Sequence, residues 1–77
     1  MSEYMVVMRY SLHFVNGLPA LLFVQKIRVK KDLIEYYRKK GLTDKEIAEI
    51  LFGKLENCLK THRSIEKCEK ILGIKVI

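Results

Sequence analysis

Two long apolar segments open the chain, and a turn signal separates them. Residues 4–15 and 18–29 are rich in β-branched and aromatic side chains, and Asn16-Gly17 between them is the strongest short-range signal for a β-hairpin. A two-residue turn also sets the register of every pair along the two strands. The pattern therefore predicts a β-hairpin over residues 4–29.

The hairpin register predicts one apolar face and one mixed face. The face expected to cover the core is almost wholly apolar and consists of Tyr4, Val6, Met8, Tyr10, Leu12 and Phe14 opposite Val29, Ile27, Gln25, Phe23, Leu21 and Pro19. The other face mixes Arg9, Ser11, His13, Lys26 and Arg28 with Met5, Val7, Val15, Leu18, Leu22 and Val24. A two-stranded ribbon is marginal in water on its own. The half-apolar outer face therefore predicts a partner, most simply a second copy of the chain in a homodimer.

The apolar period changes to the helical repeat after the hairpin. We expect a first helix over residues 30–40, which Gly41 ends in a left-handed cap. Thr43 and Glu46 have the spacing of a capping box, which opens a second helix. Gly53 is expected to break that helix.

A third helix is predicted from about Lys54 to Leu72, where Gly73 ends it. Turned at about 100° per residue, this helix has a basic side and an apolar side. The basic side carries Lys60, Arg63 and Lys67, and the apolar side carries Leu55, Cys58, Leu59, His62 and Ile65. The tail of residues 74–77 is strand-like, and it either adds to the hairpin sheet or packs as an apolar end.

These elements predict an α+β fold in a single domain over residues 1–77. The hairpin occupies residues 4–29, and a helical region follows over residues 31–73. We expect the second and third helices to form a helix-turn-helix.

Length and charge favour a small nucleic-acid-binding domain. The chain has 77 residues, a net charge of +6 and a pI near 9.5, which suits a polyanionic partner. No apolar run approaches the roughly 18–20 residues needed to span a membrane, and the N-terminus has no signal-peptide pattern. We therefore expect a cytoplasmic protein without a membrane partner. Abundant Lys, Glu and Ile with a single Gln favour a thermophilic source.

The reactive side chains do not predict catalysis. Cys58 and Cys68, on one predicted helix, would lie about 15 Å apart, too far for an internal disulfide. Cys58 and His62 have the spacing of metal ligands on a helix, but structural zinc usually takes four ligands and the only other histidine lies on the hairpin. No nucleophile–base set or phosphate loop stands out. We expect no enzyme activity, no metal and no cofactor.

Part of the helical region resembles a known family. GLTDKEIAEILF (residues 41–52) is similar to the second-helix segment of LuxR-type helix-turn-helix domains, and LKTHRS (residues 59–64) resembles their recognition-helix segment. Leu72-Gly73-Ile74 matches the closing pattern of that family, so the resemblance covers roughly residues 31–74. It implies a transcription-factor-like domain that reads DNA with its third helix, at Lys60, Thr61, His62 and Arg63. A small archaeal or viral regulator would also have these features.

The function predicted from the sequence is sequence-specific binding of double-stranded DNA by a transcriptional regulator whose third helix enters the major groove. The expected DNA-binding residues are Thr43, Lys45, Lys54, Asn57, Lys60, Thr61, Arg63, Ser64 and Lys67.

Three alternatives stay open. Glu56, Glu66 and Glu69 could pair with the basic stripe and make it an ordinary solvated face. The half-apolar hairpin face could instead serve a protein-interaction module, such as an inhibitor or accessory factor of a mobile element. RNA binding through the basic helix ends is a third possibility.

Overall fold

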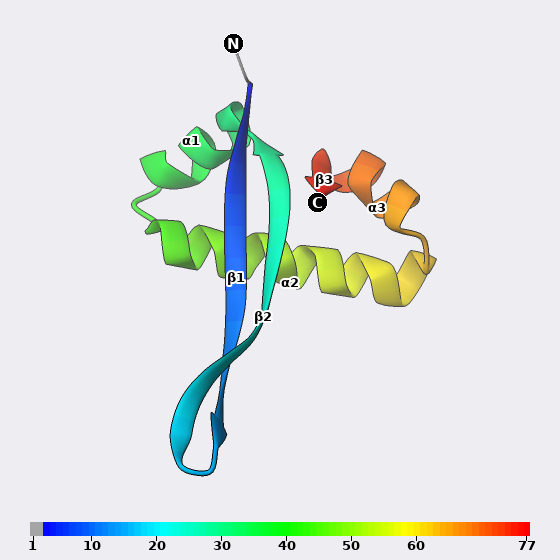
Figure 1. Cartoon of the computed structure of the whole chain (residues 1–77). Coiled ribbons are helices and arrows are strands. Elements are labelled where there is room, and N and C mark those ends of the chain that lie inside the picture. Colours follow the sequence, from blue (N-terminus) through cyan, green and yellow to red (C-terminus); the bar gives the residue numbers. More distant parts are fainter. Residues whose placement is uncertain (1–2) are drawn as a thin grey trace.

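The computed structural model describes residues 3–77, with the side chains of residues 11, 12 and 21–24 outside the described part. The elements are β1 (Tyr4–Val15), β2 (Leu18–Lys30), α1 (Lys31–Lys39), α2 (Asp44–His62), α3 (Ile65–Leu72) and β3 (Ile74–Val76) (Figure 1). This arrangement confirms the predicted α+β fold, in which an N-terminal hairpin is followed by three helices.

The sheet has the order β1-β2-β3, with β2 antiparallel to both neighbours. Asn16 and Gly17 both have positive φ, 53° and 78°, as a tight turn matched to strand twist requires. Of the two possibilities for the C-terminal tail, the structure shows the first, because β3 pairs with residues 27–29 of β2. Among the described residues, no strand pairs with the other edge of β1.

A β-bulge changes the register half-way along the hairpin. From the turn to Leu12 the pairs are those expected, with Val15 opposite Leu18 and Leu12 opposite Leu21. Ser11 then pairs with Phe23, so Leu22 is an extra residue in β2. Every pair beyond it is displaced by one position from the prediction.

This displacement reverses the predicted faces of β1, because a one-residue slip moves each side chain to the opposite face. Met5 and Val7, expected outside, lie opposite Val29 and Ile27, which are 0% and 1% exposed as predicted for the core. The prediction that alternate residues of β1 would enter the core was wrong for every one whose side chain is described. These side chains are all exposed: Tyr4, Val6, Met8, Tyr10 and Phe14. Pro19 and Gln25 are also exposed rather than in the core. The predicted core residues Leu12, Leu21 and Phe23, and the outer residues Ser11, Leu22 and Val24, have side chains outside the described part.

Local signals set the end of α1 and the start of α2. Gly41, at φ 87°, follows α1 as expected. The capping box is present at α2: the backbone N–H of Glu46 donates to Thr43 Oγ1 at 3.2 Å, and the backbone N–H of Thr43 donates to Glu46 Oε1 at 3.1 Å. These reciprocal bonds satisfy donors that the first turn of a helix leaves free.

The predicted break at Gly53 was wrong, because α2 continues through it for 19 residues to His62. Glycine costs a helix interior only about 0.5–1 kcal/mol relative to alanine, and buried residues lie on both sides of it, including Leu51 and Leu55. The predicted third helix over 54–72 is therefore two pieces. The corner lies instead at Arg63, which is left-handed with φ 53°, and at Ser64, whose side chain caps α3.

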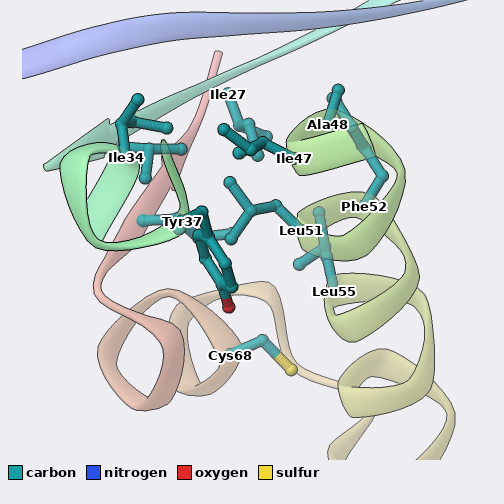
Figure 2. Packing of buried hydrophobic residues seen from close by; sticks show 11 residues of the cluster. Ile27, Ile34, Tyr37, Ile47, Ala48, Leu51, Phe52, Leu55 and Cys68 are labelled. Atoms are coloured by element: carbon teal, nitrogen blue, oxygen red, sulfur yellow. The ribbon is translucent and has the colours of Figure 1, made fainter. Parts of the chain in front are cut away.

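The core lies between the sheet and the three helices. Its buried residues are Ile27, Val29, Ile34, Tyr37, Ile47, Ala48, Leu51, Phe52, Leu55, Cys68 and Ile74. Figure 2 shows the apolar side of α2 facing Ile34 and Tyr37, with Cys68 at the α3 end of the cluster. In Figure 1, α2 crosses the hairpin, and the part of the hairpin around the turn extends beyond the helices. We call residues 11–24 the hairpin arm.

Candidate nucleic-acid interface

The nine predicted DNA-binding residues do not form one surface. Thr43 and Lys45 lie at the start of α2, whereas Lys60 and Thr61 lie near its end. A helix of 19 residues is about 28 Å long. The two groups therefore lie at opposite ends of the same helix, and the single DNA-reading third helix expected from the sequence is not present.

Several of these side chains have structural partners. Thr43 and Ser64 cap α2 and α3, and the Ser64 hydroxyl accepts from the backbone N–H of Lys67 at 3.3 Å. Lys54 Nζ donates to the hydroxyl of Tyr37 at 3.0 Å. Thr61 Oγ1 donates to the carbonyl oxygen of Asn57 at 3.3 Å, within α2. Four of the nine side chains predicted to bind DNA therefore form hydrogen bonds within the chain itself.

The three residues of the predicted basic stripe are all exposed around the turn between α2 and α3. We call this group the basic corner: Lys60, Arg63 and Lys67. Two of the three carboxylates that, in one alternative, could pair with these cations have other partners. Glu56 forms an ion pair with Arg9 of β1, and Glu69 accepts from the backbone N–H of Val76 at 2.9 Å. Across residues 3–77, no ion pair involves a residue of the basic corner.

A second basic surface, on the outer face of the sheet, was not predicted. Because Ile27 and Val29 point into the core, the alternate residues of β2 point away from the helices. Lys75 of β3 pairs with Arg28 and therefore shares this outward face. We call the group the basic sheet face: Lys26, Arg28, Lys30 and Lys75, all exposed.

None of the three described strands contains Asp or Glu, so no acidic side chain of the sheet interrupts the basic sheet face. The neighbouring outward residues on β1 are Tyr4, Val6, Met8 and Tyr10, which pair with Lys30, Arg28, Lys26 and Val24. Successive cations on β2 are roughly 6.5 Å apart along the strand. The surface therefore combines a row of positive charges with a row of apolar and aromatic side chains.

The register explains why sequence reasoning missed this surface. The predicted register placed Lys26 and Arg28 opposite Val7 and Met5, on a face shared with Arg9 and His13. In the structure they pair instead with Met8 and Val6. A usable signal was nevertheless present, because Lys26, Arg28 and Lys30 alternate with the apolar Ile27 and Val29. Such alternation assigns three cations to the outer face whatever the register of β1.

His62 and Tyr36 are titratable side chains that lie outside these two surfaces. His62, expected on a core or interface side, is exposed at the end of α2. Lys40 lies over the ring of Tyr36 at 4.3 Å, and hydrogen bonding and charge from Lys40 lower the pKa of that tyrosine. In residues 3–77, no group of three or more His, Cys, Asp or Glu side chains is placed to hold a metal ion.

The two cysteines lie on different helices, contrary to the expectation of one. Cys58 is half-buried on α2 and Cys68 is fully buried on α3, and both are free thiols. Burial, together with the neighbouring Cys58 thiol, raises the pKa of Cys68 to about 11. This thiol is therefore protonated near neutral pH, as expected of a core residue.

Comparisons with known proteins identified no relative of this chain. No protein-family model, curated protein or solved structure matches the chain. Within the described residues, no helix has both the length and the apolar character to cross a membrane.

Proposed function

We propose that the protein binds nucleic acid, with double-stranded DNA as its principal ligand, through the basic sheet face. The observation that carries the proposal is the grouping of Lys26, Arg28, Lys30 and Lys75 on one exposed face of the described sheet, whose strands contain no Asp or Glu. In this proposal the protein acts in the cytoplasm as a homodimer and regulates transcription, as the LuxR-like segment suggests.

The chemistry of this face suits a phosphate backbone. Lysine and arginine on a strand present regularly spaced donors, and contacts to phosphates supply most of the affinity of DNA-binding proteins. Strands and β-ribbons bind duplex grooves in several DNA-binding folds. A recognition helix is less well supported, because α3 has eight residues, or about 12 Å of helix.

The basic corner is a second candidate surface for the same ligand. Its support is that Glu56 and Glu69 are held by Arg9 and by Val76 rather than by the corner lysines and arginine. The corner also contains the residues that the LuxR resemblance assigned to DNA contact. The two surfaces make different predictions for charge-reversal variants.

The test compares two double variants, Arg28→Glu with Lys75→Glu and Lys60→Glu with Arg63→Glu. Both change the net charge equally, so each controls for the long-range electrostatic loss in the other. Binding to a labelled duplex is titrated by fluorescence anisotropy between about 50 and 200 mM salt. We expect the sheet variant to lose at least about tenfold in affinity and about two units of the salt slope, and the corner variant to lose clearly less.

The opposite ranking would assign the contact to the basic corner and reject the sheet. An absence of salt-dependent binding by the wild-type protein would reject nucleic-acid binding altogether. Unlabelled single-stranded DNA and double-stranded RNA serve as competitors. If either displaces the duplex at a lower concentration than duplex DNA itself does, double-stranded DNA is not the principal ligand.

A further inference from the structure

The free edge of β1 is unusually open for a strand of this length. β1 has 12 residues and pairs only with β2 in the described sheet. Natural edge strands are commonly protected by lysine, proline, shortness or a covering element. Between Tyr4 and Val15 the strand contains no lysine or proline, and its only full charge is Arg9. The sequence of β1 thus resembles an interior strand.

A groove runs along this edge beside the helices. It has a volume of about 610 Å³, and six consecutive residues of β1, from Met5 to Tyr10, line it. Because successive side chains point to opposite faces of a strand, six in a row can line one groove only along the backbone edge. The opposite wall contains Ile34 of α1 and Ile47 and Ala48 of α2.

The charges around the groove are balanced. Arg38 Nε lies 3.2 Å from Asp44 Oδ1, and Arg9 forms an ion pair with Glu56. Lys45 and Glu49 both lie on the rim. These carboxylates disfavour a polyanion in the groove, whereas an uncharged extended strand could use the free backbone edge.

The hairpin arm of the same chain is an uncharged, extended segment of the kind that this groove could accept. Residues 11–24 contain no Lys, Arg, Asp or Glu, and Figure 1 shows this part of the hairpin extending beyond the helices. Phe14 is 78% exposed and Leu18 is 70% exposed. An uncharged strand without helical support therefore lies next to a helix-lined groove that has no strand in it.

We propose that a second copy of this chain fills the groove, with the two β1 strands pairing antiparallel about a twofold axis near Tyr10. Residues 11–15 of each copy then lie along residues 5–9 of the other. Each unsupported arm thereby comes to rest beside the helices of the partner. Five residues on each side of Tyr10, 5–9 and 11–15, take part, and the twofold axis forms both contacts at once, as a closed interface requires.

The proposed register also matches side chains across the interface. Phe14 lies opposite Val6 of the other copy, and both face outward, while Val15 lies opposite Met5 on the inner face. The described side chains of the hairpin that are at least half exposed are Val6, Met8, Tyr10, Phe14, Val15 and Leu18. All of them except Leu18 belong to β1, the strand that forms the proposed interface.

Sedimentation equilibrium of the purified chain without nucleic acid tests the association. At about 100 µM the wild-type protein is expected to be dimeric, which corresponds to a Kd in the micromolar range or below. Phe14→Lys should weaken the dimer at least about tenfold, since it removes the aromatic–β-branched pair with Val6 of the partner from both halves of the twofold interface. This side chain is exposed in the isolated chain, so folding should persist, as circular dichroism can verify.

Ile65→Lys is the matched control, because Ile65 is 53% exposed on α3, outside the proposed contact. A monomeric wild-type protein would overturn the proposal, as would equal weakening by the two lysine variants. Val7→Glu is unsuitable for this purpose because Val7 packs against the core.

A crosslinking experiment tests the position of the axis. Directly paired residues of antiparallel strands have Cα atoms about 4.5–5.5 Å apart, within the range of a disulfide. Tyr10→Cys should therefore form a covalent dimer under copper–phenanthroline oxidation, seen on a non-reducing gel. Lys26→Cys, on the outer face of β2, should crosslink no more than the wild-type protein. A dimer in which Tyr10→Cys does not crosslink would refute this interface while leaving the nucleic-acid proposal untouched.

Discussion

At the scale of single residues, Arg9 joins the hairpin to α2. Its side chain donates to Gln25 Oε1 at 2.7 Å, forms an ion pair with Glu56 and lies 4.8 Å from the centre of the Phe52 ring. This arginine is the charged residue of the inner face of β1, and it lies at the margin of the core. Because Gln25, Glu56 and Phe52 all contact its guanidinium group, the face of β1 that carries this charge can pack against the helices.

Glu46 gives a residue-scale prediction about pH. Hydrogen bonds from the backbone N–H and the hydroxyl of Thr43 lower the pKa of its carboxyl group. Folding therefore favours the ionised form, and the stability that Glu46 contributes is present above its ordinary pKa and lost as the pH falls through the lower folded value.

Urea unfolding at several pH values between about 3 and 6 tests this assignment. Glu46→Gln should reduce the fall in the free energy of unfolding on acidification, with Glu49→Gln as the control on the same helix. Glu49→Gln should keep the pH dependence of the wild-type protein. If Glu46→Gln kept it as well, the Glu46 carboxylate would not contribute to the pH dependence of stability.

At the scale of elements, the continuity of α2 makes Gly53 a site for stabilisation. A Cβ atom added at Gly53 would meet no atom within 4 Å, and its φ is not positive. Gly53→Ala should therefore raise the free energy of unfolding by about 0.5–1 kcal/mol. For a domain of this size the rise in Tm is roughly 2–8 °C, measurable by circular dichroism.

Gly73→Ala is the matched control, because Gly73 has φ 68° at the end of α3 and an alanine there is strained. It should lower the Tm although it has equal space around it. A fall in Tm for Gly53→Ala would instead indicate a turn at Gly53, as the sequence suggested.

The elements that could be predicted are those that short-range chemistry determines. The Asn16-Gly17 turn, the capping box at Thr43 and the helix end at Gly41 each depend on a few neighbouring residues. The bulge and the unbroken α2 depend instead on burial against distant segments, which a sequence pattern does not state. For the same reason the basic corner was recognised by its residues but assigned to one long helix, and the basic sheet face was missed.

At the scale of the whole molecule, the two proposals fit together geometrically. In the proposed dimer the β2 strands of the two copies are three strand spacings apart, or about 14 Å. Arg28 pairs with Val6, four residues from the axis at Tyr10, so the two Arg28 positions are also about 26 Å apart along the strands. The two basic sheet faces are therefore centred about 30 Å apart, close to the roughly 34 Å of one turn of B-DNA, and could reach phosphates about one helical turn apart.

Dimer formation predicts that thermal stability depends on protein concentration. Association of folded chains shifts the equilibrium away from unfolded ones by mass action, so the Tm of the wild-type protein should rise with concentration. Melting followed by circular dichroism over about a hundredfold range measures this effect. Phe14→Lys should show little change over that range, and a wild-type Tm independent of concentration would contradict the dimer.

The extra residue at Leu22 separates the hairpin into two parts under different constraints. The tight turn determines pairing in the arm, whereas burial of Ile27 and Val29 determines pairing beside the helices. Because the bulge absorbs the one-residue mismatch, the arm is a replaceable module. A different hairpin could be grafted between Ser11 and Phe23 without changing which side chains enter the core, so assembly could be redesigned, or diverge in evolution, while the body of the protein keeps its sequence.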